Sequence, residues 1–448
     1  MKQDRTESKF RKKLDSFSSS FCAAKWWNST IWLGSGQTTS CHHPPWNDIP
    51  KKVIENPKLL HNTKEKKKDR KKMLAGKRPK GCDYCWKVQD ASPSNIPDRV
   101  YKSMIYTDEE LQEAFSTKPK EDVNLKTLEV SFDRTCNFAC SYCNPSFSTT
   151  WVKDINKNGP YTDMVSEGRF TYLDNHPQAQ KFKARDIENP YVISFWSWWE
   201  SDLKHSLQEL RVTGGEPTLS PELWKLLERV SVESAENLNL KKLKIAINSN
   251  LGAPEDIFKK LKLVSKKIPN FDLYTSCEAV GLQAEYIRDG LNYTQWFNRL
   301  TELKRNANFK TLSVMATINS LCLWSLTDLL DDLLKLRMKT LTNDGLNFTL
   351  NILRFPSFQS CLVLPVDIRK SRQEHLQQWL NSYDEGVLYE HEINHMKRLI
   401  VYLGQPEPKD ISKLRLDFKL FYSQYDQRRG KSFNETFPNE LSDWYLNL

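Results

Sequence analysis

This chain of 448 residues has no long apolar run. Its first residues, MKQDRTESKFRKKLDSF, lack the apolar stretch of a secretory signal peptide. The most apolar run, Tyr191 to Trp199, is far too short to cross a bilayer. We therefore expect a soluble, cytoplasmic protein without a membrane partner.

The ten cysteines do not resemble the disulfide framework of a short secreted domain, because the chain is long and many of them lie in tight clusters. Clustered cysteines are typical of metal ligation in a reducing compartment. The length of 448 residues allows a large core and two or three domains. The composition therefore favours a protein that binds metal through thiolates.

The net charge of +10 is uneven, because Lys64 to Lys80 (KEKKKDRKKMLAGKRPK) contributes much of it. Such a run indicates either a patch that binds anions or nucleic acid, or the exposed face of a helix. Arginine and aromatic residues do not interleave along it, which favours the helix face. Nucleic acid is kept as a partner that this segment predicts.

Three cysteines, Cys136, Cys140 and Cys143, directly follow a run that alternates like a strand, Leu128 to Phe132. A structural zinc or an ordinary electron-transfer cluster usually has four protein ligands. Three thiols therefore indicate a metal centre with one position open to a small molecule. A zinc-binding loop or a set of buried thiols is the alternative that this motif alone leaves open.

A second motif, Glu209 to Pro217 (ELRVTGGEP), lies about seventy residues further on. It predicts a strand that ends in two glycines and an acid, with Ser220 and Pro221 as the first residues of a helix. Adjacent glycines let the backbone approach a ligand closely, and Glu216 offers a carboxylate to a cation. The segment is typical of a ligand-binding turn.

The spacing Cys136-x3-Cys140-x2-Cys143, with Tyr142 before the last cysteine, resembles the signature of the radical SAM superfamily, and Gly214 to Pro217 is similar to its Gly-Gly-Glu-Pro motif. The resemblance covers roughly residues 125 to 360. It implies a 4Fe-4S cluster that reductively cleaves S-adenosylmethionine to methionine and a 5'-deoxyadenosyl radical. That radical abstracts hydrogen from a substrate, and flavodoxin or ferredoxin is the kind of electron donor implied.

The resemblance also implies which residues contact S-adenosylmethionine. Gly214 to Glu216 are expected at its amino group, and Arg288 at its carboxylate, as a planar cation suits. Ser249 and Asn250 are expected near the ribose, and Ser276 and Asn319 near the methionine or adenosine parts. The complete expected set is Tyr142, Thr213, Gly214, Gly215, Glu216, Ser249, Asn250, Ser276, Arg288 and Asn319.

Strand-like and helical segments alternate after residue 125, which predicts an α/β fold with a parallel sheet and right-handed crossovers. The resemblance implies that this part, residues 125–360, is a partial (β/α)6 TIM-like barrel with an insertion at 144–208. The expected strands are Thr127 to Phe132, Glu209 to Val212, Leu243 to Ile247, Phe271 to Thr275, Thr311 to Ile318 and Asn347 to Leu353.

Residues 21–95 are expected to form a Cys-rich module after a disordered tail, residues 1–20. It contains a predicted strand, Thr30 to Leu33, a turn at Gly34 to Gly36, and four cysteines, Cys22, Cys41, Cys82 and Cys85. By spacing, zinc and a second iron–sulfur cluster are equally suitable occupants. The module resembles a twitch or SPASM auxiliary-cluster domain, although such domains usually follow the barrel. His42 and His43 are expected to be loop residues.

Three further segments complete the sequence prediction. Thr107 to Phe115 is expected as a helix with Thr107 as N-cap. Cys277 ends a strand and is expected to be buried and inert, with hydrogen-atom donation or a substrate adduct as its alternative role. Residues 361–448 are expected as a helical C-terminal extension, best defined at Arg369 to Tyr383 and Tyr389 to Tyr402.

The sequence favours a peptide or protein as the radical enzyme's substrate, by resemblance to auxiliary-cluster enzymes, with RNA as the second interpretation. A different class is also compatible with the motifs, namely a zinc-binding protein without enzymatic activity that binds nucleic acid through Lys64 to Lys80. Metal content distinguishes the two, because iron–sulfur protein is brown and zinc protein is colourless.

Overall fold

The computed structural model describes residues 6–92, 95–172, 189–338 and 345–448. The chain divides into two compact units. The first unit comprises Met1–Asp133, Gln180–Gly214 and Val232–Ile245, and the second comprises Arg134–Ala179, Gly215–Ser231 and Ala246–Leu448. Within the described ranges, every helix is too short or too polar to span a membrane.

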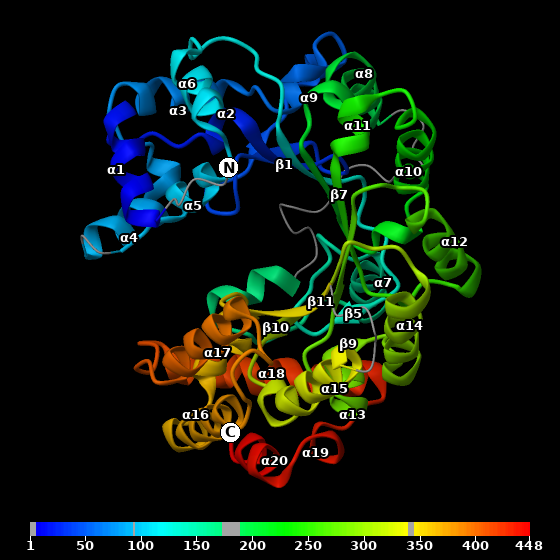
Figure 1. Ribbon diagram of the computed structural model, residues 1–448. Coiled ribbons are helices and arrows are strands. Elements are labelled where there is room, and N and C mark those ends of the chain that lie inside the picture. Colours follow the sequence, from blue (N-terminus) through cyan, green and yellow to red (C-terminus); the bar gives the residue numbers. More distant parts are fainter. Residues whose placement is uncertain (1–5, 93–94, 173–188, 339–344) are drawn as a thin grey trace. The chain divides into compact units, whose positions relative to one another are not determined.

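The first unit contains a sheet in which β1, β4 and β6 are parallel, while β2 and β3 are antiparallel additions at its edge (Figure 1). Gly36 closes the predicted turn with φ of 67° and donates its N–H to Trp32 O at 2.9 Å. The predicted N-terminal hairpin is thereby confirmed, and its first strand lies directly beside β4. In sheet order the strands are β6 (Glu209–Thr213), β4 (Thr127–Ser131), β1 (Asn28–Trp32), β2 (Gln37–Thr39) and β3 (Asn47–Asp48).

Helices pack around this sheet. The predicted helix with Thr107 as N-cap is confirmed as α6, because Thr107 Oγ1 accepts the Glu110 N–H at 3.2 Å and Glu110 Oε2 accepts the Thr107 N–H at 2.9 Å. The helices of this unit are α1 (Glu7–Phe17), α2 (Ala24–Trp27), α3 (Lys64–Leu74), α4 (Asp83–Ala91), α5 (Asp98–Met104), α6 (Asp108–Ser116), α8 (Pro190–Trp198), α9 (Lys204–Ser206) and α11 (Leu238–Lys242).

The expectation of a disordered tail over residues 1–20 is wrong for the part of it that forms α1. Phe10 and Leu14 lie four residues apart on one face of this helix and are only 2% and 0% exposed. Their burial in the hydrophobic core of the first unit stabilises this helix. The many charged residues around them make the segment look disordered when only its composition is considered.

The basic helix α3 is only partly a charged surface. Lys66 and Arg70 point inward and are 1% and 0% exposed, whereas Lys68 and Lys71 are exposed. Lys66 Nζ donates to Ser29 Oγ and Thr38 Oγ1, both at 2.8 Å, which ties α3 to the β1–β2 hairpin. Part of the positive charge in Lys64 to Lys80 therefore holds the first unit together.

The second unit contains three parallel strands in the order β11 (Leu346–Ile352), β10 (Thr311–Ile318) and β8 (Phe271–Ser276). A separate antiparallel pair joins β5 (Ala139–Cys140) to β9 (Arg288–Asp289). β7 (Lys244–Ser249) and α10 (Pro221–Glu233) carry the chain from one unit into the other. Ser220 directly precedes α10 and Pro221 begins it, as the sequence predicts.

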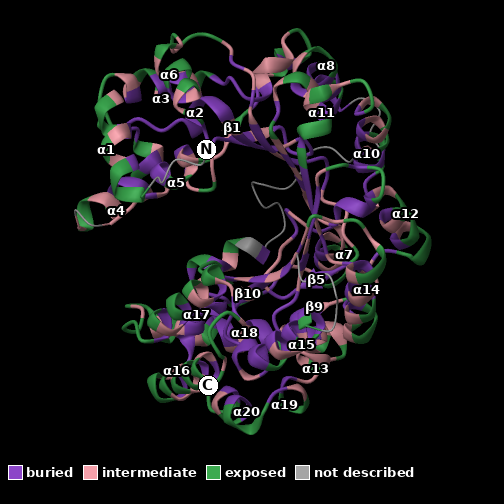
Figure 2. Ribbon diagram, in the orientation of Figure 1, coloured by how far each residue is buried: buried purple, intermediate pink, exposed green. Residues whose placement is uncertain are grey.

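All six strands expected from the sequence are present as β4, β6, β7, β8, β10 and β11. In Figure 2 their residues are mostly in the buried and intermediate colours. The α/β class and parallel pairing are confirmed for β4 with β6 and for β8, β10 and β11. Closure of the strands into a partial (β/α)6 barrel stays a prediction.

The remaining helices of the second unit include the predicted C-terminal ones. Arg369 to Tyr383 lies largely in α16 and Tyr389 to Tyr402 in α17, which confirms both stretches as helical. The helices are α7 (Thr149–Asn158), α12 (Glu255–Ser265), α13 (Gly281–Ile287), α14 (Tyr293–Asn306), α15 (Leu326–Met338), α16 (Val366–Asn381), α17 (Glu390–Leu403), α18 (Ile411–Arg429), α19 (Phe433–Thr436) and α20 (Asn439–Leu446).

We expect Arg70→Met to destabilise the protein strongly. The Arg70 guanidinium donates to Lys25 O at 2.9 Å and to Asn62 Oδ1 at 3.0 Å, so the substitution removes hydrogen bonds to two buried acceptors. The free energy of unfolding should fall by about 3 kcal/mol, measured by urea denaturation. Lys71→Met, on the exposed side of the same helix, is the control and should change it by less than about 0.5 kcal/mol. Equal effects of the two substitutions would contradict the inward placement of Arg70.

The stability of the protein should also fall as the pH decreases below about 6.5, the ordinary pKa of histidine. His61 is completely buried, and burial and then the charges of Lys66 and Arg70 lower its pKa. The unfolded chain therefore takes up a proton at His61 before the folded chain does. The contribution of neutral His61 to the free energy of unfolding is thus complete above pH 6.5 and is lost on acidification. His61→Gln should reduce the slope of unfolding free energy against pH between about 6.5 and 5. An unchanged slope would show that other groups cause it.

Candidate metal and cofactor site

The three clustered cysteines lie in the second unit, on the segment that leads into α7. Cys140 is 9% exposed, and Cys136 and Cys143 are half-buried. Burial, and then the nearby Cys140 thiol, raises the pKa of Cys136 to about 12. Burial, and then the charges of Cys140 and Cys136, raises the pKa of Cys143. The three thiols therefore lie close enough to influence one another's ionisation, and a metal that binds them must displace their protons.

The backbone of this segment is held from α7. Thr149 Oγ1 accepts the Cys136 N–H at 3.1 Å, and Trp151 Nε1 donates to Cys140 O at 3.0 Å. Ser148, the N-cap of α7, donates from Oγ to Phe138 O at 2.6 Å. The helix thus fixes the loop on which the thiols are mounted.

Phe138, between the first two cysteines, is enclosed by glycines. A Cβ added at Gly252 would lie 2.5 Å from the Phe138 ring, and one at Gly290 would lie 2.8 Å from it. Since Gly290 also has φ of 103°, a side chain is excluded there on two grounds. Two glycines far from the cysteines in sequence therefore provide the space for their loop.

The Gly-Gly-Glu motif meets the cysteine segment through its backbone. The Glu216 N–H donates to Thr135 O at 2.7 Å, directly before Cys136. A Cβ added at Gly215 would lie 2.4 Å from Thr135 O and 2.6 Å from Arg134 O. In the first unit, Gly214 has φ of 133°, and a Cβ there would lie 2.6 Å from Asp133 O. Glycine is required at both positions because backbone occupies the place of a side chain.

The Glu216 side chain is 1% exposed, and both of its carboxylate oxygens accept hydrogen bonds from neighbouring residues of the second unit. Oε1 accepts from Thr218 N, Thr218 Oγ1 and Ser249 Oγ at 3.0, 2.6 and 2.9 Å, and Oε2 accepts from Asn250 N at 2.6 Å. Burial raises the pKa of the Glu216 carboxyl, while these donors act in the opposite direction. The predicted site residues Glu216, Ser249 and Asn250 are therefore brought together in one network.

Arg288 lies beside Cys140 because β9 pairs with β5, with Cys140 opposite Arg288. Its Nη1 donates to Cys140 Sγ at 3.8 Å, while Nε and Nη2 donate to Glu278 Oε2 at 2.9 and 2.8 Å. Burial acts to lower the pKa of Arg288, but the charge of Glu278 raises it above its ordinary value. Arg288 is thus a buried cation next to a thiol, and two of its nitrogens are bound to a carboxylate.

Glu278 is a residue of this site that the sequence analysis did not single out. Its side chain is 0% exposed, and Oε1 accepts from Tyr142 OH at 3.1 Å, so it joins Tyr142 to Arg288. The one signal in the sequence was its position three residues beyond the end of a strand-like run. Strand ends carry many polar residues, so position alone did not distinguish it.

The other predicted contacts are distributed along the strand ends. Asn319 is 1% exposed and donates from Nδ2 to Thr317 O at 2.9 Å, and Ser276 is the last residue of β8 and half-buried. Thr213 belongs to the first unit, where Oγ1 donates to Glu129 Oε1 at 3.3 Å.

Cys277 is fully buried, its Sγ donates to Ala279 O at 3.2 Å, and burial raises its pKa to about 12. These features fit an inert thiol.

The C-terminal extension also supports the cysteine segment. Tyr425 of α18 is fully buried, and its OH donates to Tyr286 O at 3.0 Å and to Ala139 O at 3.3 Å, next to Cys140. Arg429 Nε donates to Asp289 Oδ2 at 3.2 Å, which braces β9. The sequence carries no motif for this role, since the residues involved read as an ordinary helix.

In the first unit, the four cysteines Cys22, Cys41, Cys82 and Cys85 line one cavity of about 20 Å³. His43 lies in its wall, but its Nε2 is hydrogen-bonded to Asp98 Oδ2 at 2.6 Å. His42 lines a separate polar cavity of about 450 Å³ together with Glu129 and Arg211.

Over the described ranges, no three His, Cys, Asp or Glu side chains are placed so that they could hold a single metal ion. A single zinc ion binds its thiolates at about 2.3 Å, which brings bound sulfurs into contact with one another. Neither group of cysteines is therefore arranged as a preformed single-ion site.

No family model matches the chain, and no curated protein matches it in sequence. Among solved structures, the chain is similar to Streptococcus suis SuiB bound to S-adenosylmethionine. The identity is 13%, the match covers 79% of this chain and 69% of that one, and the TM-score is 0.33. A similarity this low does not establish a common fold, so the chemistry is inferred from the geometry of the residues.

Gly215→Ala should disrupt the cysteine segment, because its Cβ would lie 2.4 Å from a backbone oxygen that cannot rotate away. We expect a free energy of unfolding lower by about 1–3 kcal/mol, measured by urea denaturation. Gly404→Ala is the matched control, since its Cβ would meet the end of the Gln373 side chain at 2.9 Å and would lie at an ordinary contact distance of 3.6 Å from the backbone oxygen of Val401. An unchanged free energy of unfolding for Gly215→Ala would contradict this close packing.

Proposed function

We propose that this protein is a radical SAM enzyme whose cluster is held by Cys136, Cys140 and Cys143. A 4Fe-4S cluster with three protein ligands supplies the electron for reductive cleavage of S-adenosylmethionine, which yields methionine and a 5'-deoxyadenosyl radical that abstracts hydrogen from a substrate. The protein contributes binding, orientation and exclusion of water around that chemistry.

The observation that carries the proposal is the hydrogen bond from Glu216 N to Thr135 O at 2.7 Å. It joins the Gly-Gly-Glu motif to the residue before Cys136, although about eighty residues separate them in sequence. Two motifs that must act on one cofactor therefore lie against each other. Burial and then the Cys140 thiol raise the pKa of Cys136 most, the Phe138 N–H lowers it, and the charge of Glu216 raises it further, which supports the proximity of carboxylate and thiol.

The residues around the thiols fit the amino group of S-adenosylmethionine. Among the described residues, Oε2 of Glu216 accepts only the Asn250 N–H, so the carboxylate retains acceptor capacity for an ammonium group. Asn248 Oδ1, on β7, is a buried acceptor without a partner in the described part of the chain. A buried acceptor of this kind is costly unless a ligand or water pairs it, so Asn248 is a further proposed contact.

Arg288 and Tyr142 are proposed to act near the carboxylate of S-adenosylmethionine and over the cluster, respectively. Since Glu278 occupies Nε and Nη2 of Arg288, Nη1 is the nitrogen proposed to bind a carboxylate. Glu278 keeps Arg288 in place, because a buried guanidinium requires a fixed counter-charge. Ser249, Asn250, Ser276 and Asn319 stay proposed contacts for the ribose, methionine or adenosine parts, as do Thr213 and Gly214.

A peptide or protein is the proposed substrate, and flavodoxin or ferredoxin is the proposed kind of electron donor. RNA is the second candidate, because the outward side of α3 presents Lys64, Lys68 and Lys71 to solvent. A phosphate backbone is attracted to such a row of lysines, and its binding weakens steeply with salt.

The test is anaerobic reconstitution with iron and sulfide, followed by dithionite, S-adenosylmethionine and a search for 5'-deoxyadenosine by mass spectrometry. We expect the wild-type protein to form 5'-deoxyadenosine. Cys136→Ala/Cys140→Ala/Cys143→Ala should form none and should lose about four irons per chain.

Cys322→Ala/Cys361→Ala is the matched control, since both thiols are fully buried and lie outside the two cysteine groups. It should retain iron and product formation. A wild-type protein that holds iron but forms no 5'-deoxyadenosine would refute the proposal, as would product formation by the triple variant.

A further inference from the structure

One face of the sheet in the first unit is lined by polar side chains. Along β1, β4 and β6, residues two apart in sequence project to the same face. In the register of the sheet they form two rows, the first of Asn28, Thr127 and Glu209 and the second of Thr30, Glu129 and Arg211. The residues between them, such as Val130 and Val212, are fully buried. A parallel sheet is usually apolar on both faces, so this polar face indicates a role other than core packing.

A cavity of about 450 Å³ lies against this polar face, and all six residues of the two rows line it. Its other walls come from Tyr101 and Lys102 of α5, from Ile105 directly after that helix, and from His42. Pockets that bind small molecules have volumes of roughly 300–1,000 Å³. The cavity is therefore large enough for a small molecule, and every residue that lines it belongs to the first unit.

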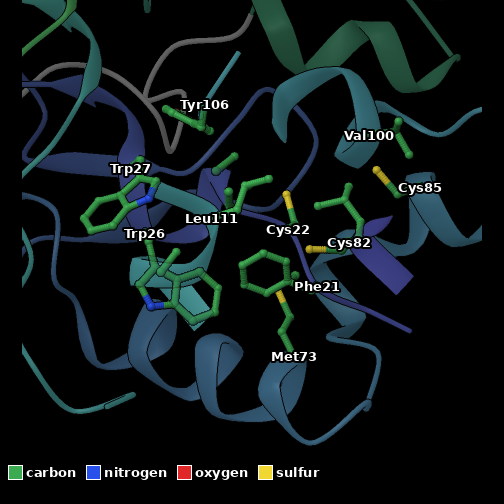
Figure 3. Close-up of a cluster of buried hydrophobic side chains, with 14 of the residues drawn as sticks. Phe21, Cys22, Trp26, Trp27, Met73, Cys82, Cys85, Val100, Tyr106 and Leu111 are labelled. Carbon is green, nitrogen blue, oxygen red and sulfur yellow. The ribbon is translucent and has the colours of Figure 1, made fainter. Parts of the chain in front are cut away.

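The wall that α5 provides is anchored in the hydrophobic core. Figure 3 shows Val100 and Tyr106, which flank Tyr101 to Ile105 in sequence, among the buried side chains of the hydrophobic cluster. Tyr106 OH and Thr127 Oγ1 share a hydrogen bond of 2.9 Å, and Thr127 Oγ1 donates to Asn28 Oδ1 at 2.6 Å. These contacts fix the wall to the sheet. A cavity that is formed before binding reduces the entropy that binding costs.

The cavity presents charges of both signs. Glu129 and Glu209 supply carboxylates, and Arg211 and Lys102 supply cations. Arg211 Nη2 lies 3.8 Å from Glu209 Oε1, which is an ion pair without the short contact of a hydrogen bond, and the two side chains are 23% and 35% exposed. Glu129 Oε1 accepts from Thr213 Oγ1 at 3.3 Å, and a carboxylate accepts about four hydrogen bonds in all. The charged groups are thus held in place and accessible to a ligand.

The mixture of charges indicates the chemistry of the ligand. A ligand with only negative groups would be repelled by the two carboxylates, and one with only positive groups by the two cations. A ligand that carries both an ammonium and a carboxylate group pairs with each kind through charge-assisted hydrogen bonds. Tyr101 and Ile105 are 48% and 58% exposed and add apolar surface to the same cavity. An amino acid or a short peptide combines all three features.

We propose that this cavity binds an amphoteric ligand with the chemistry of an amino acid or a short peptide. Glu129 and Glu209 bind its ammonium group, and Arg211 and Lys102 bind its carboxylate. Tyr101 contacts its side chain. The inference does not depend on the proposed function, because binding to the first unit requires neither the cluster nor S-adenosylmethionine.

The experiment is saturation-transfer NMR on the full chain as purified. One arm uses a mixture of the common free amino acids, and the other uses tripeptides with free termini. We expect saturation transfer to ligands of at least one arm, and the arm that responds identifies the source. Absence of transfer in both arms would overturn the proposal. Equal transfer to N-acetylated, amidated forms of the responding ligands would overturn it too, since these forms lack both terminal charges.

Glu129→Gln/Arg211→Gln should weaken binding of the responding ligand by about tenfold or more, because the variant removes one charged partner of each sign. Lys120→Gln/Glu121→Gln is the matched control. It also removes one cation and one carboxylate, at exposed positions of the first unit outside the cavity, and should leave the affinity unchanged. Equal affinities of the two variants would overturn the proposal.

A second variant leaves the strands intact. Lys102 is half-buried on α5, so Lys102→Gln changes the wall of the cavity and not the sheet. It should also weaken binding by about tenfold, with a circular dichroism spectrum like that of the wild-type protein. Lys87→Gln, at an exposed position of α4, is its control and should bind as the wild type does. Undiminished affinity in folded Lys102→Gln would refute the role of this residue in binding the carboxylate.

Discussion

The contact between the Glu216 amide and the Thr135 carbonyl is the constraint on which the candidate cofactor site depends. It is formed by backbone atoms, at 2.7 Å, and it requires glycine at position 215 because Thr135 O lies where a side chain would be. A backbone contact is rigid compared with a pair of flexible side chains. It therefore holds a carboxylate at a defined place beside the first cysteine.

Three further elements of the second unit hold the cysteine segment in place. α7 binds the carbonyl and amide groups of the cysteine segment, β9 pairs with β5, and Tyr425 of α18 donates to Ala139 O. Buried polar groups of this kind are paired almost throughout, and the Glu278–Arg288 pair shows the same principle for charge. The C-terminal helices are thus part of the site's support.

The first unit uses charge in a similar way. Lys66 and Arg70, which look like part of a solvent-exposed basic run, are enclosed and hydrogen-bonded to backbone and side-chain acceptors. Net charge and lysine content alone therefore overstate the positive surface of α3.

The sequence by itself determined the strands, the helix that begins after Thr107, the N-terminal hairpin, and both cysteine groups, because alternation, capping residues and cysteine spacing are local signals. It did not predict helix α1, the role of Glu278, or the approach of Arg288 to Cys140 across 148 positions of sequence. Only the tertiary structure decided those features. Burial of a few apolar side chains and pairing between distant strands depend on long-range packing, and no local pattern records which distant partner a residue will meet.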